Sequence, residues 1–289
     1  MTLLDRIREE RLTLSFEVFP PKTDTSFENV REATERIAAL GPAYVSVTYG
    51  AGGAGSRFTM DIARELRLKT GVDILVHLTS VGSDRDSVER FLSRMRDYDL
   101  NSVMALRGDL PRDGSRPETY PHAADLIRAV REAGSFCIGA ACYPEVHPES
   151  RNQAEDIRSL KEKQEAGADF LTTQMFFDNN LLYNFLYKLR ETGVTLPVVP
   201  GIMPITAANQ VKRARELSGS FMPRRFISLV DRFGGDAAAM CQAGIAYATD
   251  QIIDLYANGI RHVHVYTMNK PEVAAAIQNN LKEMLGKVF

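Results

Sequence analysis

A glutamate within an apolar run is the residue of this sequence that most clearly indicates chemistry. Glu17 lies in Leu14-Ser-Phe-Glu-Val-Phe-Pro-Pro21, where Phe16 and Val18 occupy one side of a predicted strand and the carboxylate the other. Desolvation raises the pKa of a carboxyl group, so such a glutamate can hold and deliver a proton near neutral pH. The alternative interpretation is a structural ion pair between Glu17 and a lysine or arginine across the fold.

Polar residues also follow other short apolar runs. Arg107-Gly108-Asp109 comes directly after residues 102–106, and the glycine lets the backbone turn so that both charged side chains can face one ligand. His77 lies near the end of another run. Alone, the tripeptide is more typical of a surface turn and His77 of a core histidine, so their chemistry depends on a fold that brings them to Glu17.

Two further segments are suited to a flat heterocycle. Tyr143 and His147 lie in Ala140-Ala-Cys-Tyr-Pro-Glu-Val-His-Pro148, where the prolines stiffen a loop and the aromatic rings can stack. Gln174, in Thr172-Thr-Gln-Met-Phe-Phe177, offers an amide donor and acceptor to the edge of a pterin, flavin or purine.

Metal and dinucleotide sites are disfavoured by the residue spacing. His262 and His264 share a strand face, but no third ligand is evident. The cysteines (Cys137, Cys142 and Cys241) are odd in number and lack a C-x-x-C pair, so we predict buried free thiols and no metal. Residues 50–55 match G-x-G-x-x-G, but no acidic residue ends the next strand, which favours a flexible ligand-side loop over a Rossmann site.

The elements that position these residues alternate between short apolar runs and longer amphipathic segments. Strands are predicted at residues 13–19, 44–48, 74–78, 102–106, 137–141, 170–173, 198–202 and 263–266. Helices are predicted at residues 26–40, 59–70, 84–98, 123–133, 153–166, 180–191, 206–217, 221–233, 236–258 and 271–285.

Eight strand–helix units predict an α/β protein, a single (β/α)8 TIM-type barrel over residues 1–289 with extra helices before the eighth strand. An open doubly wound sheet uses the same units and stays possible. A barrel places its active site at the carboxyl ends of the strands, which is where Glu17, His77, Asp109 and Gln174 fall.

Charge and hydropathy restrict the partner. The net charge is −2 and the sequence pI about 6.2, which gives no basic surface for nucleic acid or an anionic membrane. No run approaches the roughly 20 apolar residues of a spanning helix, and the first 14 residues alternate charge with leucine, unlike a signal peptide. We therefore expect a cytoplasmic protein with a small-molecule partner.

Taken together, the motifs resemble the methylenetetrahydrofolate reductase family. The matching segments are Ser15-Phe-Glu-Val-Phe-Pro-Pro-Lys22, Val45-Ser-Val-Thr-Tyr-Gly-Ala51, His77-Leu-Thr79, Ala105-Leu-Arg-Gly-Asp-Leu-Pro111, Tyr143-Pro-Glu-Val-His-Pro148, Thr173-Gln-Met-Phe-Phe-Asp178 and Pro200-Gly-Ile-Met-Pro204. The resemblance implies a TIM-type barrel that binds FAD and reduces methylenetetrahydrofolate to methyltetrahydrofolate with electrons from NADH or NADPH.

The same resemblance implies roles for individual residues. Flavin-contacting positions are matched by Thr48, His77, Arg107, Gly108, Asp109, Tyr120, Ala141, Tyr143, His147, Asp156 and Lys163, and folate-handling positions by Glu17, Asp109, Gln174, Gln210 and Lys270. Glu17 and Asp109 are the implied catalytic residues. Glu17 would protonate the anilinic nitrogen of the methylene bridge, and Asp109 would stabilise the resulting cation. Lys163 and Arg107 would face the pyrophosphate or ribityl part of the cofactor.

Two positions depart from the family pattern. Ala214 stands where bacterial relatives place an aromatic residue against the nicotinamide or folate, and Lys270 stands where they carry arginine. The departures leave open NADH, NADPH or another electron donor, an accessory electron-transfer subunit and a homo-oligomer. The chain ends soon after its last predicted helix, so no carboxyl-terminal regulatory domain is expected. A folate- or corrinoid-dependent methyltransferase without flavin and a noncatalytic ligand-binding subunit are the alternatives.

Overall fold

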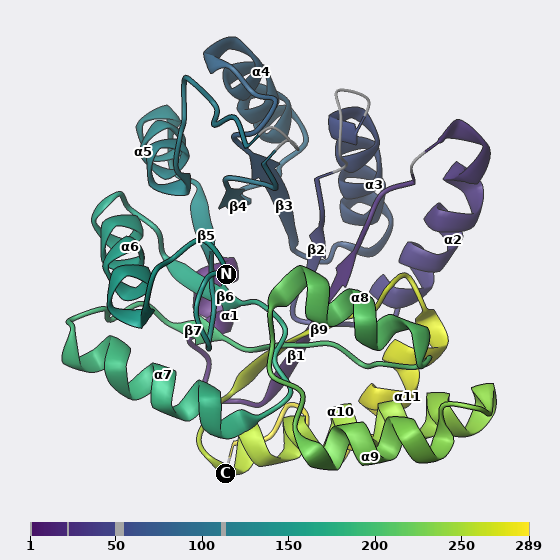
Figure 1. The fold of residues 1–289 in the computed structure, drawn as a ribbon. Helices are drawn as coiled ribbons and strands as arrows, with labels where there is room; N and C mark the ends of the chain where they lie inside the picture. The colour runs from purple at the N-terminus through teal and green to yellow at the C-terminus, as the bar shows by residue number, and fades with distance from the viewer. Residues whose placement is uncertain (1, 22, 50–54, 111–113, 289) are drawn as a thin grey trace.

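The structure is a computed structural model that describes residues 2–21, 23–49, 55–110 and 114–288. One parallel sheet curves into a nearly closed barrel in the order β7-β6-β5-β4-β3-β2-β1-β9-β8 (Figure 1). Its strands are β1 Thr13–Val18, β2 Val45–Val47, β3 Ile74–Thr79, β4 Ser102–Leu106, β5 Cys137–Cys142, β6 Phe170–Thr173, β7 Val198–Val199, β8 Gly201–Ile202 and β9 His262–Tyr266. The predicted TIM-type barrel is confirmed, and the open doubly wound alternative is excluded.

The barrel closes at Pro200, which divides the predicted seventh strand in two. On one side β7 pairs with β6, and on the other β8 pairs with β9. Pro200 has no N–H to donate to a ladder, but its carbonyl accepts a hydrogen bond of 2.9 Å from the His264 backbone N–H. The chain therefore leaves the ladder with β6 and joins the ladder with β9 across one residue, Pro200.

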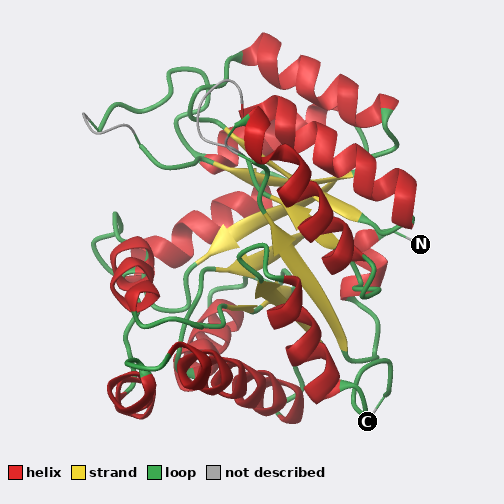
Figure 2. Cartoon of the chain, turned by 90° about the vertical axis from the view of Figure 1, so that its right-hand side faces the viewer, coloured by secondary structure: helices red, strands yellow, loops and turns green. Residues whose placement is uncertain are grey.

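Helices cover the outer face of the barrel (Figure 2). They are α2 Phe27–Ala38, α3 Gly55–Thr70, α4 Arg85–Asp97, α5 Ala123–Ala133, α6 Gln153–Glu165, α7 Asn179–Glu191, α8 Asn209–Ser218, α9 Arg224–Phe233, α10 Ala237–Ala257 and α11 Pro271–Leu281, with a short 3-10 helix, Asp24–Ser26, before α2. The extra helices expected before the last strand are α9 and α10. Helix α8 begins three residues later than predicted, because the Gln210 side chain accepts the backbone N–H groups of Thr206 and Ala207.

Alternate strand residues divide the protein into an outer core and a lumen. Leu14, Phe16 and Val18 of β1 pack against the helices, whereas Ser15 and Glu17 point into the barrel. The C-terminal segment lies at the end where β1 begins, since the Gly286 backbone N–H donates to the Leu12 carbonyl. The carboxyl ends of the strands therefore form the opposite end of the barrel, which we call the mouth.

A short helix that the sequence did not predict closes the end away from the mouth. Helix α1 (Leu3–Ile7) begins with a capping box in which Thr2 and Asp5 exchange hydrogen bonds. Its Leu3 and Ile7 side chains are buried in the lower lumen, where they pack with Tyr44, Leu75, Met104, Phe170 and Val199. Five residues are too few to show a helical period in the sequence.

The prediction of three buried free thiols is only partly correct. All three cysteines are free, but only Cys142 is buried, so the prediction of buried thiols is wrong for Cys137 and Cys241. Cys137 is partly exposed because it lies at the start of β5, near the barrel end that α1 covers. No helix within the described residues is long and apolar enough to span a membrane.

Closure at β8 leaves no space for a side chain at Gly201. A Cβ there would contact the Tyr266 hydroxyl and lie 2.6 Å from the Thr173 carbonyl oxygen. We predict that Gly201→Ala lowers the free energy of unfolding by about 1–3 kcal/mol, because the overpacked residue must displace a strand or the Tyr266 ring. Chemical denaturation measures the effect. Gly235→Ala is the matched control, since a Cβ at Gly235 meets no atom within 4 Å; equal stability of the two variants would contradict the prediction.

Candidate active site

Glu17 lies in the lumen just below the mouth. The register places it beside Ser46 of β2 and Tyr266 of β9. The nearest ring nitrogens are Nε2 of His77 at 3.8 Å and Nε2 of His264 at 4.0 Å. No lysine or arginine of the described residues forms an ion pair with Glu17, so in that part of the chain the structural ion pair is excluded.

The surroundings of Glu17 favour its neutral form. Burial raises the pKa of Glu17 to about 8, and the neighbouring Ser46 side chain opposes the rise only in part. Burial also lowers the pKa of His77 to about 4 and holds the pKa of His264 well below its usual range. Both imidazoles are therefore neutral near pH 7 and supply no cation to stabilise a carboxylate. Glu17 is a protonated acid that retains access to the mouth, since 20% of its side chain is exposed.

His77 offers a free binding group beside this acid. Its side chain, on β3, is 8% exposed, and its buried Nε2 atom has no hydrogen-bond partner. A buried polar atom without a partner costs free energy, which a ligand that bonds to it restores.

The segment after β4 carries two charged side chains of different environment. Arg107 is held by Glu149 through two hydrogen bonds of 2.7 and 2.5 Å, and Arg116 approaches the same carboxylate at 3.3 Å. Gly108 has a φ of +87°, and a Cβ there would lie 3.1 Å from the Cβ of Thr79. This turn leaves Asp109 exposed on the rim of the mouth. Glycine is needed here for both its backbone conformation and its small size.

Helix α6 fixes the aromatic loop that follows β5. The Tyr143 and His147 rings meet edge to face with centroids 4.6 Å apart, and Oδ2 of Asp156 accepts the His147 backbone N–H at 3.0 Å. Lys163 donates to the Ala141 carbonyl at 2.8 Å. Burial lowers the pKa of Lys163 and raises the pKa of Asp156, while their opposite charges favour both charged forms. The structure thus brings together all five of these sequence-predicted residues.

The other side of the mouth is organised around Thr206, which the sequence did not single out. Gln210 uses its side-chain oxygen to accept the Thr206 backbone N–H at 2.9 Å, and Lys270 donates to the Thr206 hydroxyl at 2.9 Å. The side-chain oxygen of Gln210 is therefore engaged within the protein, and its amide N–H groups are what it can offer to a ligand. Gln174, after β6, lies near the Tyr143 side chain and accepts the Met175 backbone N–H.

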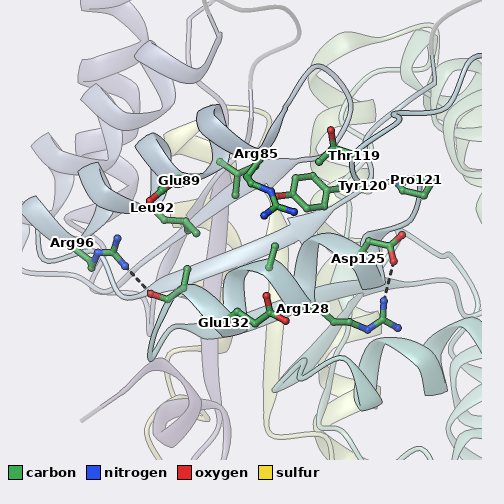
Figure 3. A pocket seen from close by; sticks show the side chains of 13 residues that line it. Arg85, Glu89, Leu92, Arg96, Thr119, Tyr120, Pro121, Asp125, Arg128 and Glu132 are labelled. Atoms are coloured by element: carbon green, nitrogen blue, oxygen red, sulfur yellow. Dashed lines mark hydrogen bonds and ion pairs between the residues drawn. The ribbon is translucent and has the colours of Figure 1, made fainter.

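Three sequence-predicted positions lie in different surroundings. Thr48 follows β2, and its carbonyl accepts the Thr59 hydroxyl at 2.9 Å. Tyr120 is buried outside the barrel, where it lines a cavity of about 550 Å³ between α4 and α5 beside Arg85 (Figure 3). Ala214 is 1% exposed within the apolar cluster under α8, so its side chain does not open to the mouth.

The structure bears on the prediction for the histidine pair but not on the prediction for the glycine-rich loop. His262 and His264 hydrogen-bond to the hydroxyls of Thr13, Ser15 and Ser46, and no metal-binding group of three or more ligands occurs among the residues that the structure describes. The glycine-rich loop lies outside the described residues, apart from its last glycine at the start of α3.

Two side chains of the mouth were missed by sequence reasoning for different reasons. Ser46 lies between Val45 and Val47 in β2, and this alternation is a signal for a lumen-facing position. Glu149 is 42 residues from its partner Arg107, and nothing in the local sequence indicates their pairing.

The fold and the mouth define a TIM-barrel enzyme with a protonated carboxylic acid at its small-molecule site. A family profile described as Methylenetetrahydrofolate reductase matches residues 2–282. The chain belongs to the methylenetetrahydrofolate reductase family.

Relatives with assigned names agree with this membership. The 5,10-methylenetetrahydrofolate reductase of Pectobacterium carotovorum is 33% identical over 271 residues, which cover 94% of this chain and 90% of the relative. The enzyme of the same name from Escherichia coli is 32% identical, with 94% and 91% covered. Zea mays has a relative named methylenetetrahydrofolate reductase (NADH) 1, which is 31% identical, with 96% of this chain and 50% of that protein covered.

A solved structure shares the fold at low sequence identity. It is an uncharacterised Clostridium thermocellum protein whose description states that it binds two copies of 5-methyl-5,6,7,8-tetrahydrofolic acid. The TM-score is 0.70 at 12% identity, with 98% of this chain and 97% of that chain covered. At this identity the likeness supports the fold alone.

The raised pKa of Glu17 has a consequence for stability. Between the ordinary glutamate pKa of 4.5 and the raised pKa of about 8, the folded protein holds a proton on Glu17 that the unfolded chain has lost, so wild-type stability falls as pH rises through this window. We predict that the free energy of unfolding of Glu17→Gln, measured relative to wild type, increases by on the order of 3 kcal/mol as pH rises from 5 to 8. Urea denaturation across this range measures the difference. Glu32→Gln, on the exposed face of α2, is the control; a difference for Glu17→Gln that does not depend on pH would refute the assignment.

Proposed function

We propose that this protein reduces methylenetetrahydrofolate to methyltetrahydrofolate, using bound FAD and electrons from NADH or NADPH. Family membership supports the folate substrate, and the names of the bacterial relatives agree with it. The observation that carries the proposal is Glu17, an acid whose pKa of about 8 keeps its proton available at the mouth near neutral pH. Opening the five-membered folate ring requires such a proton donor at the bridging nitrogen.

The residues at the mouth fit a flavin cofactor. The unpartnered Nε2 of His77 and the Tyr143 ring suit the polar edge and the face of a flat heterocycle. Among the described residues Lys163 donates one hydrogen bond, to the Ala141 carbonyl, so its amino group has donors left for the phosphate or ribityl part. Arg107 is already paired with Glu149, so the carboxylate of Glu149 balances its positive charge. The cofactor, when bound, would supply hydride transfer from the nicotinamide to the folate carbon.

The acid–base work falls to side chains of the protein. Glu17 would pass its proton to the anilinic nitrogen of the methylene bridge, and the bond from that nitrogen to the methylene carbon would break. The remaining iminium group carries a positive charge, which the exposed carboxylate of Asp109 on the rim would stabilise. Gln174, whose side-chain oxygen accepts the Met175 backbone N–H, would orient the pterin through its amide group.

The electron donor would use the same mouth. The chain presents alanine at position 214, and this side chain is buried, so α8 offers no aromatic surface there to a nicotinamide ring. Lys270 remains as a cation on that side of the mouth. We propose a reduced nicotinamide as the donor, with its contacts made mainly by the flavin and by residues other than Ala214.

The cofactor assignment predicts a flavin spectrum and release of FAD. Protein purified after expression with adequate riboflavin should be yellow, and heat or acid should free FAD because no covalent link is proposed. Absorbance and mass spectrometry of the supernatant provide the measurement. A colourless protein that still binds reduced folate would instead favour a methyltransferase, and release of FMN would correct the cofactor while keeping the reductase.

The acid role of Glu17 separates the two half-reactions. Glu17→Gln should retain flavin and permit its reduction by nicotinamide, which needs no proton from this residue. Reoxidation by methylenetetrahydrofolate should slow by about 10²–10⁴-fold, the usual loss when a positioned acid is removed. Stopped-flow absorbance measures each half separately. Equal slowing of both halves would assign Glu17 a structural role, and unchanged reoxidation would remove it from the mechanism.

A further inference from the structure

The loop that follows β9 holds the end of β1 with a side chain in place of backbone. Strands β1 and β9 lie side by side and pair in register up to Glu17, so a continued ladder would set Phe19 opposite Met268 (Figure 1). Instead, the side-chain oxygen of Asn269 accepts the Phe19 backbone N–H at 3.0 Å, and its amide nitrogen donates to the Phe19 carbonyl at 2.8 Å. One side-chain amide thus satisfies both backbone polar groups of Phe19.

A second side chain of this loop holds the residue that carries the acid. The Thr267 hydroxyl donates to the Glu17 backbone carbonyl at 2.6 Å and accepts the Asn269 backbone N–H at 3.2 Å. Thr267 is buried, so these bonds are shielded from water. We call the following set of bonds the Asn269 clamp: the Thr267 hydroxyl on the Glu17 carbonyl, and the Asn269 side chain on the Phe19 backbone.

The sequence after Phe19 leaves this end of β1 dependent on the clamp. Pro20 and Pro21 have no backbone N–H, so they cannot donate to a neighbouring strand. On the β2 side, the Thr48 backbone N–H donates to the Val18 carbonyl at 3.0 Å. Because the polar groups of successive strand residues point to opposite neighbours, the Phe19 groups face β9, where the clamp binds them.

The loop adopts an unfavourable backbone conformation to present these groups. Met268 and Asn269 both have a φ of +53°, a left-handed conformation that residues other than glycine seldom adopt in succession. Within the described ranges, the other non-glycine residue with a positive φ is Asp99, which stands alone after α4. Such strain persists only where the surrounding contacts hold it, and it is concentrated at functional sites.

The same loop also places a cation on the other side of the mouth. The Lys270 backbone N–H donates to the Thr267 carbonyl at 3.0 Å, and the Lys270 side chain donates to the Thr206 hydroxyl at 2.9 Å. Helix α11 begins at the next residue, Pro271. The loop is therefore anchored between β9 and α11, and it joins the strand that carries the acid to the side of the mouth that carries Lys270.

The titratable groups that face the Glu17 carboxyl group are uncharged near pH 7. They are His77 on β3, His264 and Tyr266 on β9, and Tyr44 next to β2. Burial lowers the pKa of both histidines and raises the pKa of both tyrosines. Since none of these groups is a cation that would stabilise the carboxylate, the acid strength of Glu17 depends on how far its carboxyl group is kept from water.

We propose that Asn269 is a positioning residue for Glu17. The clamp fixes the backbone on both sides of Val18, and this fixes the direction of the Glu17 side chain and its depth below the mouth. The proposal rests on the proposed function, in which Glu17 is the proton donor to the folate. Without the clamp, the end of β1 would separate from β9 and water would reach the carboxyl group.

The titration of Glu17 tests the clamp independently of turnover. Carbon-13 NMR of protein labelled at the glutamate carboxyl groups follows Glu17 from pH 5 to pH 10, and its signal is the one missing from Glu17→Gln. Asn269→Gly suits the left-handed backbone but lacks the amide group. Its Glu17 midpoint should fall by about one pH unit or more, because water stabilises the carboxylate. An unchanged midpoint in folded Asn269→Gly would overturn the proposal.

Two further variants separate the clamp from the loop. Met268→Gly is the matched control, because it changes the neighbouring residue of equal φ and keeps every bond of the clamp; its midpoint should equal that of wild type. Thr267→Val removes one bond of the clamp at similar volume, so its midpoint should fall less than in Asn269→Gly. A wild-type midpoint in Thr267→Val, or a fall in Met268→Gly as large as in Asn269→Gly, would contradict the clamp. Thr267→Val decides the proposal where Asn269→Gly does not fold.

The two half-reactions provide a kinetic readout of the same effect. Reoxidation of reduced Asn269→Gly by methylenetetrahydrofolate should lose about fivefold more rate at pH 8 than at pH 6, because a midpoint one unit lower leaves less Glu17 protonated at pH 8. Flavin reduction by the nicotinamide should not acquire this pH dependence. An equal loss at both pH values would assign Asn269 a structural role only. Absence of flavin from the wild-type protein would instead reject the proposed function and leave the carboxyl titration standing.

Discussion

The structure depends on the closure of a parallel sheet, which points every second side chain of each strand into an enclosed lumen. In an open sheet Glu17 would face a helix or solvent, and its carboxyl group would ionise readily. Closure through Pro200 and Gly201 instead places it among imidazole, tyrosine and serine side chains, where burial keeps it protonated to about pH 8. The same constraint keeps the lumen histidines uncharged. The chemistry proposed for this protein thus depends on the closed sheet topology more than on any single contact.

Sequence reasoning recovered the features that repeat along the chain. Buried parallel strands are apolar at successive positions, so the strand runs were recognisable, and a polar residue at a run's end indicated the mouth. The division of residues 198–202 was not foreseen, because a proline in a short run also suits one edge strand. Helix α1 lacked the length that gives a helix its periodicity. Both features depend on neighbours distant in the sequence, Leu171 and His264 for the divided strand and Tyr44 for α1.

The candidate site was predictable in its residue types and less so in their pairing. Glu17, His77, Gln174 and the Tyr143 loop gather at the mouth, as barrel geometry requires. The engagement of Arg107 by Glu149 and of Gln210 by its own helix terminus could not be inferred, since charge and amide groups carry no sequence signal of their partners. Position 214 shows the same limit, because the family resemblance singled out the alanine and only packing shows that it is buried.

Helix α1 makes the lumen a dead end. In the described part of the chain, Leu3 and Ile7 fill the space between the strands at the far end, so a ligand as large as a pterin would enter and leave the lumen through the mouth. For the proposed reductase, the electron donor and the folate would therefore bind in turn at the mouth. Each product would have to dissociate before the next ligand could bind. A five-residue helix, which touches no substrate, would in this way determine the order in which the enzyme meets its ligands.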